Sequence, residues 1–407
     1  MKYNFTDIID RVGKDAIAFD AEDAIKSGSL GPKDAQIDPS FDIIPMWVAD
    51  MNFATAPSVT RALHERIDHP CFGYFEPPAE YYNLIVDWHK RRNGVTNLLP
   101  EHIGYENGVL GGVVSALNVL CSKGDKVLVH SPTYIGFTNS LKNNGYDIVS
   151  SPLCRDEQGV WRMDFDDMER RIAKNRIHAA IFCSPHNPTG RVWTRDEIAQ
   201  AMEIYRKHDV FVISDEIWSD ILLDGHRHVP TQSVSDDARQ RTVALYAPSK
   251  TFNLAGLVGS YHIVYNSWLR DRMRKEASLS HYNGQNVLSM RALMGAYSEE
   301  GHEWVDELNE VLSENVRYAC DFIKEKFNGV AFSRPEGTYM LFLDCAQWCE
   351  EHGKSIDDLQ RAGIRVGVLW QDGRAFGGKE TIRMNLALPK SRLIEALDRL
   401  DKYVFNA

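Results

Sequence analysis

Three polar side chains each follow a short apolar run that predicts a buried strand. Asn187 stands in Asn-Pro-Thr-Gly, Asp215 in Asp-Glu, and Lys250 in Ser-Lys-Thr-Phe. Each is separated from the next by about one strand–helix unit. The carboxyl ends of parallel strands meet at one edge of a sheet, where open α/β sheets bind ligands. We therefore expect the three side chains to converge there.

Each of the three has an ordinary reading and a chemical one. Taken alone, Asn187 fits a simple Asn-Pro turn, and Asp215 fits a helix N-cap. Asp215 could also hydrogen-bond a buried ring nitrogen and keep it protonated. Lys250 lies in an apolar, glycine-containing stretch, and a partly desolvated lysine has a lowered pKa and can form an imine. The order of the three motifs favours the chemical reading.

A glycine-rich turn earlier in the chain indicates a phosphate site. Residues 106–112 (Glu-Asn-Gly-Val-Leu-Gly-Gly) precede a predicted helix over 113–120. Free N–H groups and the positive dipole end at a helix N-terminus attract phosphate. Ser249 offers a hydroxyl for the same purpose. The glycines do not fit G-x-G-x-x-G with a following acidic residue, which disfavours a dinucleotide.

The elements that must position these groups predict an α/β protein. Continuous apolar runs alternate with amphipathic helices, which is typical of a mostly parallel sheet covered on both faces. The predicted strands are residues 126–130, 179–183, 210–214 and 242–246. A capping box at Thr194–Glu197 starts a helix, and Asp224-Gly225 predicts a hairpin or an extended excursion. An α+β region follows, with one long helix over 286–326 and strands at 330–333, 340–344 and 382–385.

Length and composition limit the class of protein. The 407 residues predict two domains, a large one over 50–290 and a small one formed by 1–49 with 291–407. A net charge of −11 and the absence of a basic stripe argue against a nucleic-acid partner. No apolar run is long enough for a membrane span. The odd count of seven cysteines fits no disulfide or zinc framework, which favours reduced thiols and a cytoplasmic protein.

The motifs resemble a known superfamily. Asn187 to Gly190, Asp215-Glu216 and Ser249 to Phe252 resemble fold-type I pyridoxal-phosphate (PLP) enzymes of the class I/II aminotransferase superfamily. Residues 45–53 and Phe72-Gly73-Tyr74 resemble the MalY/PatB-type cystathionine β-lyases, which are C–S lyases. The resemblance covers nearly the whole chain. It implies a mostly parallel central sheet covered by helices, plus a smaller α+β domain.

The resemblance also implies roles for individual residues. Lys250 would hold pyridoxal 5'-phosphate as a Schiff base, and Asp215 would pair with the pyridine nitrogen. Asn187 would contact the phenolic oxygen, and Tyr134 would stack on the ring, although a core aromatic explains Tyr134 equally well. The phosphate would be held by backbone and hydroxyl donors, namely Val109, Leu110 and Ser249.

The substrate and the partner subunit are implied in the same way. Arg383 would bind the substrate carboxylate bidentately, where a surface strand arginine is the plain alternative. Ala49 would line the substrate site through its backbone. Tyr74 would reach the phosphate or the substrate of the neighbouring subunit, in a homodimer with a shared active site.

The sequence departs from the resemblance at four places. Ala247 replaces a serine common in relatives, Trp218 stands where His or Tyr is usual, and Asn52 replaces an aspartate. Residues 370–374 (Trp-Gln-Asp-Gly-Arg) replace a loop rich in Ser, Pro and Gly. These differences bear on the substrate more than on the cofactor.

The sequence therefore predicts a PLP-dependent carbon–sulfur β-lyase. Its substrates would be small amino acids, namely cystathionine, cysteine or cysteine S-conjugates, and it would release a thiol, pyruvate and ammonia. A class I/II aminotransferase is the alternative, because the fold and the cofactor residues do not separate the two. A PLP-binding regulatory protein with residual activity is a second alternative.

Overall fold

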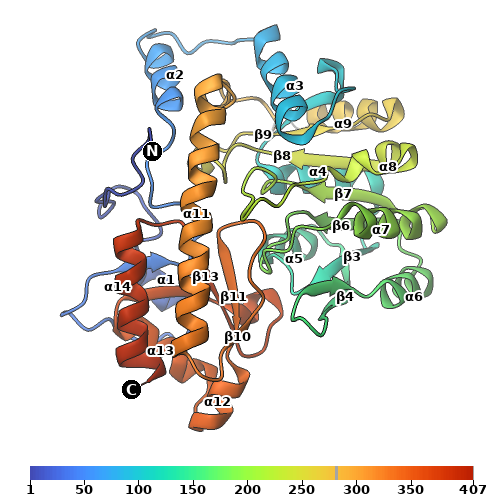
Figure 1. Cartoon of the computed structure of the whole chain (residues 1–407). Helices are drawn as coiled ribbons and strands as arrows, with labels where there is room; N and C mark the ends of the chain where they lie inside the picture. The colour runs from blue at the N-terminus through green and yellow to red at the C-terminus, as the bar shows by residue number, and fades with distance from the viewer. Residues whose placement is uncertain (280–282, 407) are drawn as a thin grey trace.

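The computed structural model describes residues 1–279 and 283–406 and contains two β-sheets (Figure 1). The larger sheet has the order β2-β9-β8-β7-β6-β3-β4-β5. Its strands are β2 (Ile103–Glu106), β3 (Lys126–Ser131), β4 (Asp147–Arg155), β5 (Trp161–Met163), β6 (Ala179–Cys183), β7 (Phe211–Asp215), β8 (Thr242–Tyr246) and β9 (Ser260–Ile263). The central strands β8, β7, β6, β3 and β4 run parallel. Strand β9 is antiparallel to β8 and to the edge strand β2, and β5 is antiparallel to β4 at the other edge. The predicted mostly parallel sheet is confirmed.

Helices cover both faces of this sheet because successive residues of each strand point to opposite sides. In β6, Ile181 packs with α4 (Val109–Leu120), α5 (Ile135–Asn143) and α9 (Ser267–Leu279). Its neighbour Phe182 packs on the other face with α6 (Phe165–Asn175), α7 (Arg195–Lys207) and α8 (Asp236–Arg241). Helix α7 begins at the predicted capping box, in which Thr194 and Glu197 bond each other's backbone. Burial on both faces explains the uniformly apolar strands.

The smaller sheet joins the two ends of the chain. Its order is β1-β12-β13-β11-β10, with β1 (Ile44–Met46) parallel to β12 (Val368–Asp372). The others are β10 (Ala331–Phe332), β11 (Met340–Asp344) and β13 (Thr381–Asn385). Around it lie α1 (Ala21–Ser27), α11 (Glu299–Lys326), α12 (Ala346–His352), α13 (Ile356–Arg365) and α14 (Lys390–Leu400) (Figure 1). The pairing of N-terminal with C-terminal strands agrees with the predicted small domain, whose boundaries stay a prediction.

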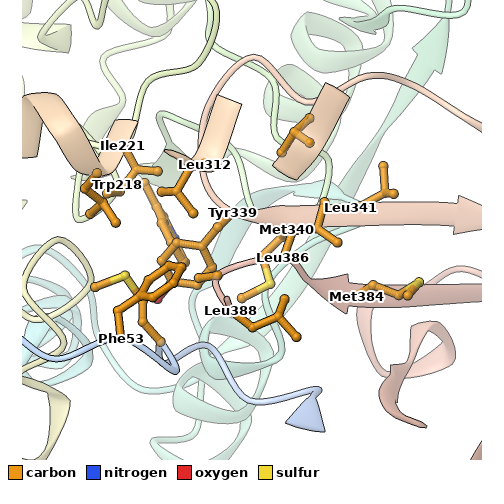
Figure 2. Packing of buried hydrophobic residues seen from close by; sticks show 14 of the residues in the cluster. Phe53, Trp218, Ile221, Leu312, Tyr339, Met340, Leu341, Met384, Leu386 and Leu388 are labelled. Atoms are coloured by element: carbon orange, nitrogen blue, oxygen red, sulfur yellow. The ribbon is translucent and has the colours of Figure 1, made fainter. Parts of the chain in front are cut away.

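One hydrophobic cluster connects the two sheets. Figure 2 shows Phe53, Trp218 and Tyr339 packed together beside residues of β11 and the segment after β13. The same cluster includes residues of α2 (Pro57–Ile67), α3 (Ala79–Asn93), α10 (Val287–Ala296) and α11. Trp218 and Tyr339 make an edge-to-face contact with ring centroids 4.7 Å apart. This packing holds the end of β7 against the smaller sheet.

Three local predictions need correction, and a fourth is narrowed to one of its alternatives. The helix before the Lys126 strand begins at Val109 rather than Val113, so two glycines lie in its first turns. The single helix over 286–326 is two helices, because Ser298 caps α11 and ends the run of α10. Residues 370–372 belong to strand β12 rather than to a loop, with only 373–376 in a short 3-10 helix. Of the two forms predicted after the third strand, the structure has the extended excursion, in which Leu222 makes a single bridge to Gly337.

None of the described helices is long and apolar enough to cross a membrane.

Candidate active site

A cavity of about 310 Å³ opens at the carboxyl ends of β6, β7 and β8. This volume lies in the range of small-molecule sites, roughly 300–1,000 Å³. Most of the predicted site residues line it: Ala49, Val109, Leu110, Tyr134, Asn187, Asp215, Ser249 and Lys250. The predicted convergence at one edge of the sheet is therefore seen in the structure.

Lys250 is half-buried and its amine is held at the cavity wall. Its Nζ donates a hydrogen bond to the carbonyl of Ala49 at 2.9 Å. It also lies 5.9 Å from the centroid of the Trp218 ring. Burial, and next the charge of Arg383, lower the pKa of Lys250 to about 8. A useful fraction of the amine is thus unprotonated near neutral pH, as imine formation requires.

Asp215 is the last residue of β7 and its carboxylate is buried beside the cavity. Oδ1 accepts the backbone N–H of Ile217 at 3.0 Å, and no side-chain donor is recorded for it among the described residues. Burial raises the pKa of Asp215 to about 7. A buried carboxylate of this kind is stabilised by a cationic hydrogen-bond donor in the cavity.

Asn187 and Arg383 contact each other directly. Arg383 donates from Nη1 to Oδ1 of Asn187 at 3.1 Å and from Nη2 to the carbonyl of Trp47 at 3.0 Å. Its Nε is buried without a hydrogen-bond partner among the described groups, and burial lowers the pKa of Arg383 to about 10. Because Oδ1 of Asn187 accepts from Arg383, the amide N–H groups of Asn187 remain for another acceptor. The surface-arginine alternative for Arg383 is wrong, since only 3% of this residue is exposed.

The first turn of α4 and Ser249 form one wall of the cavity. Gly108 is the N-cap of α4 at φ 76° and has no capping side chain, which leaves the following N–H groups to other acceptors. Val109, Leu110 and Gly111 line the cavity with Ser249. Gly112 allows the helix to lie close to the sheet, because a Cβ there would come within 2.6 Å of Leu245. The result is a helix N-terminus with an adjacent hydroxyl, which suits a phosphate.

Tyr134 supplies an aromatic wall. It is the N-cap of α5 and packs edge-to-face on Phe137, with centroids 5.4 Å apart. A Cβ at Gly136 would collide with the Tyr134 ring, so the glycine gives the ring its place. Tyr134 is thus both packed against the core and exposed to the cavity, which combines the two readings of this residue.

Tyr74 does not join the cavity of its own chain. Its side chain is fully exposed in the segment between α2 and α3, where Phe72 is also exposed. The guanidinium of Arg66 lies over the Phe72 ring, 4.7 Å from the ring centroid. The role of Tyr74 in a neighbouring subunit stays a prediction.

Sequence reasoning missed two aromatic residues of the site. Trp218 lines the cavity, although it stood out only as a departure from relatives. Tyr339 packs on Trp218 and donates its hydroxyl hydrogen to the carbonyl of Ala49 at 3.1 Å. The same carbonyl accepts from Lys250. The position of Trp218, three residues after Asp215, could have indicated that it lines the site. Nothing near Tyr339 in the sequence indicated its contact with Ala49.

The residues fit pyridoxal phosphate. The cavity presents an amine of lowered pKa, a buried carboxylate, an aromatic ring and a helix N-terminus with a hydroxyl. The amine suits the aldehyde of the cofactor, and the carboxylate suits its basic ring nitrogen. The aromatic side chain suits the face of the ring, and the helix N-terminus with the hydroxyl suits the phosphate. The fold and the site thus define a cofactor-dependent enzyme acting on amines.

Comparison with known proteins supports the same class. Residues 42–400 match the aminotransferase class I and II family, so the chain belongs to that family. The cystathionine β-lyase PatB of Bacillus subtilis is 33% identical over 401 residues, 98% of each chain. The protein MalY of Escherichia coli is 30% identical over 363 residues, 86% of this chain and 89% of MalY.

A solved structure confirms the predicted fold type. The PLP-bound C–S lyase from Staphylococcus hominis matches with a TM-score of 0.88 and 31% identity, covering 98% of each chain. The superfamily and the MalY/PatB resemblance predicted from the sequence are both confirmed.

Proposed function

We propose that this protein is a PLP-dependent carbon–sulfur β-lyase acting on cystathionine, cysteine or cysteine S-conjugates. The observation that carries the proposal is the Lys250 amine, of lowered pKa, facing the same cavity as the buried Asp215 carboxylate. The similarity to a cystathionine β-lyase and to a C–S lyase over 98% of the chain supports the reaction type. The overall reaction converts the amino acid and water to a thiol, pyruvate and ammonium.

The chain would hold the cofactor by the groups already described. Lys250 would bond the aldehyde carbon, Asp215 the ring nitrogen and Asn187 the phenolic oxygen. The phosphate would lie at the first turn of α4, with the Ser249 hydroxyl. Bound pyridoxal phosphate supplies an electron-withdrawing ring that stabilises negative charge at the substrate Cα.

Lys250 moves the proton. When it is not bonded to the cofactor, the Nζ of Lys250 would serve as a base, and burial lowers its pKa to about 8. It takes the proton from Cα of the substrate. The thiolate then leaves Cβ, and Nζ–H can return the proton to the departing sulfur. A thiolate is a good leaving group, so elimination needs little further help.

Arg383 orients the substrate. Its guanidinium is fixed by Asn187 and by the carbonyl of Trp47, and its planar fork matches an α-carboxylate. Trp218 and the carbonyl of Ala49 bound the cavity next to Lys250. They restrict the space available to the side chain of the substrate.

The proposal includes a homodimer in which Tyr74 enters the neighbouring active site. Its complete exposure beside the exposed Phe72 supports a contact with another copy of the chain. The proposal also places the enzyme in the cytoplasm, because all seven cysteines are free thiols.

The product balance tests the reaction. The holoenzyme is incubated with L-cystathionine or S-methyl-cysteine and no keto acid, and pyruvate and thiol are measured together. A lyase releases both in equal amounts over many turnovers. An aminotransferase stops after one turnover with pyridoxamine phosphate and resumes only when a keto acid is added. That result would show an aminotransferase in place of a lyase. The two reactions are close in energy, because a barrier difference of only about 1.4 kcal/mol changes the ratio of elimination to transamination tenfold.

A further inference from the structure

A second cavity lies away from the site of Lys250 and shares no described lining residue with it. Its volume is about 450 Å³, which is enough for a small metabolite. It is bounded by the end of α3, the start of α7, helix α8, and the segment between β7 and α8 (Figure 1 shows these elements).

The wall of this cavity is positively charged, although the chain as a whole carries a net charge of −11. Three arginines, Arg195, Arg227 and Arg239, line it, and no Asp or Glu is among its described lining residues. Among the described residues, Arg195 donates only to Ser233, at 3.2 Å to the carbonyl and 3.4 Å to Oγ. Arg227 is exposed and has no recorded partner in the described chain. Only Arg239 is paired, with Asp236 at 2.8 Å.

A buried histidine adds an independent observation. The side chain of His228 lines the cavity and is 1% exposed. Its Nε2 is held by Glu216 Oε2 at 2.6 Å, while its Nδ1 is buried with no hydrogen-bond partner among the described groups. Buried polar atoms in proteins nearly always have a partner. Because the described residues supply none, a water molecule or a ligand in the cavity could provide the partner of Nδ1.

The histidine is firmly oriented by the groups behind it. Glu216 also accepts the hydroxyl hydrogen of Tyr246 at 2.6 Å and the backbone N–H of Thr231 at 3.1 Å. With this carboxylate on Nε2, Nδ1 is the ring nitrogen left for a group on the other side of the ring. Three guanidinium groups in the same cavity match the oxygens of a phosphate group, which arginine binds bidentately.

We propose that this cavity is a binding site for a small polyanion of the phosphate class, held by Arg195, Arg227 and Arg239 with His228. The site is distinct from the place of the cofactor phosphate, which lies at α4 and Ser249 on the other cavity. The proposal does not depend on the reaction that the enzyme catalyses, because it concerns residues outside that machinery.

Calorimetric titration of the holoenzyme with inorganic pyrophosphate tests the proposal. Saturating pyridoxal phosphate keeps the phosphate site at α4 filled, and a chelator removes metal ions that could bridge pyrophosphate to the protein. A constant chloride concentration keeps the electrostatic screening of the charges the same in every titration. We expect saturable binding of one pyrophosphate per chain. The double variant Arg195→Gln/Arg227→Gln should bind at least about tenfold more weakly, which corresponds to about 1.4 kcal/mol.

Two controls isolate the cavity. Arg206→Gln/Arg274→Gln makes the same change in charge at exposed arginines outside the cavity, and it should change the affinity by less than about twofold. Arg383→Lys should also leave it unchanged. Thermal unfolding checks that each variant is folded. Absence of saturable binding to the wild type in the millimolar range, an equal loss in the two double variants, or a loss in Arg383→Lys would each overturn the proposal.

Discussion

Replacement of Asp215 by asparagine should separate catalysis from stability. Burial raises the pKa of this carboxyl from its ordinary value of 3.8 to about 7. That rise of about three pH units is worth about 4 kcal/mol, at about 1.4 kcal/mol for each unit. This is the cost of the buried charge, and a cationic ring nitrogen would offset it when the cofactor is bound.

The expected loss of activity follows from the electrostatic contribution of a single preorganised group, which is typically about 3–4 kcal/mol. An amide cannot keep the ring nitrogen protonated as a carboxylate does, so most of this interaction is lost in the transition state. At about 1.4 kcal/mol per decade, kcat should fall by roughly a thousandfold. Steady-state release of pyruvate at saturating pyridoxal phosphate measures the effect. A folded, cofactor-saturated variant that keeps turnover within about tenfold of the wild type would refute this role for Asp215.

The apoprotein should respond in the opposite direction. A folded-state pKa above the unfolded value means that the folded chain retains a proton that the unfolded chain has lost between about pH 4 and 7. Stability therefore falls as pH rises through this window, and the full cost is present above about pH 7. Asp215→Asn removes that cost, so the variant should be more stable than the wild type at pH 8 by up to about 4 kcal/mol. Urea unfolding of both apoproteins at pH 4.5 and pH 8 measures the difference; a variant less stable at pH 8 would contradict the burial argument.

Three other predictions address the remaining site residues. Borohydride reduction of the holoenzyme should attach the cofactor to Lys250, and peptide mapping that finds it on another lysine would contradict the assignment. Arg383→Lys should raise KM for the amino acid about tenfold, at least as much as it lowers kcat; unchanged kinetics would exclude Arg383 as the carboxylate site, and Arg374 is a poor substitute because it is paired with Asp372 and Asp357. Mixing inactive Tyr74→Phe and Lys250→Ala subunits should restore activity in hybrid dimers, whereas proven subunit exchange without recovery would remove the shared site.

Local sequence patterns predicted the strands and the site residues that follow them. Strands β3, β6, β7 and β8 lie within one residue of their predicted bounds, because strands buried on both faces need uninterrupted apolar residues. Asn187, Asp215 and Lys250 were found from the same runs. The capping box at Thr194 marked the start of α7 for an equally local reason.

Boundaries that depend on distant contacts were predicted less well. Residues 370–372 of β12 were interpreted as a loop, because the burial of this strand comes from packing with other elements. Trp370 is buried, and its Nε1 donates to Gln360 at 2.6 Å. The start of α4 was placed four residues late, since glycines disfavour helix in isolation. Here Gly112 is favoured by the close approach of the helix to Leu245.

The sequence by itself determined the order of strand, loop and reactive group, and with it the cofactor chemistry, because these depend on residue type and local spacing. Only the tertiary structure decided which groups share a surface. Tyr339 and Ala49 meet Lys250 and Trp218 across segments far apart in the chain. The same holds for the arginines that line the cavity with His228, which come from α7, α8 and the segment between β7 and α8. Their combined positive field arises from the fold, since no local run of basic residues encodes it.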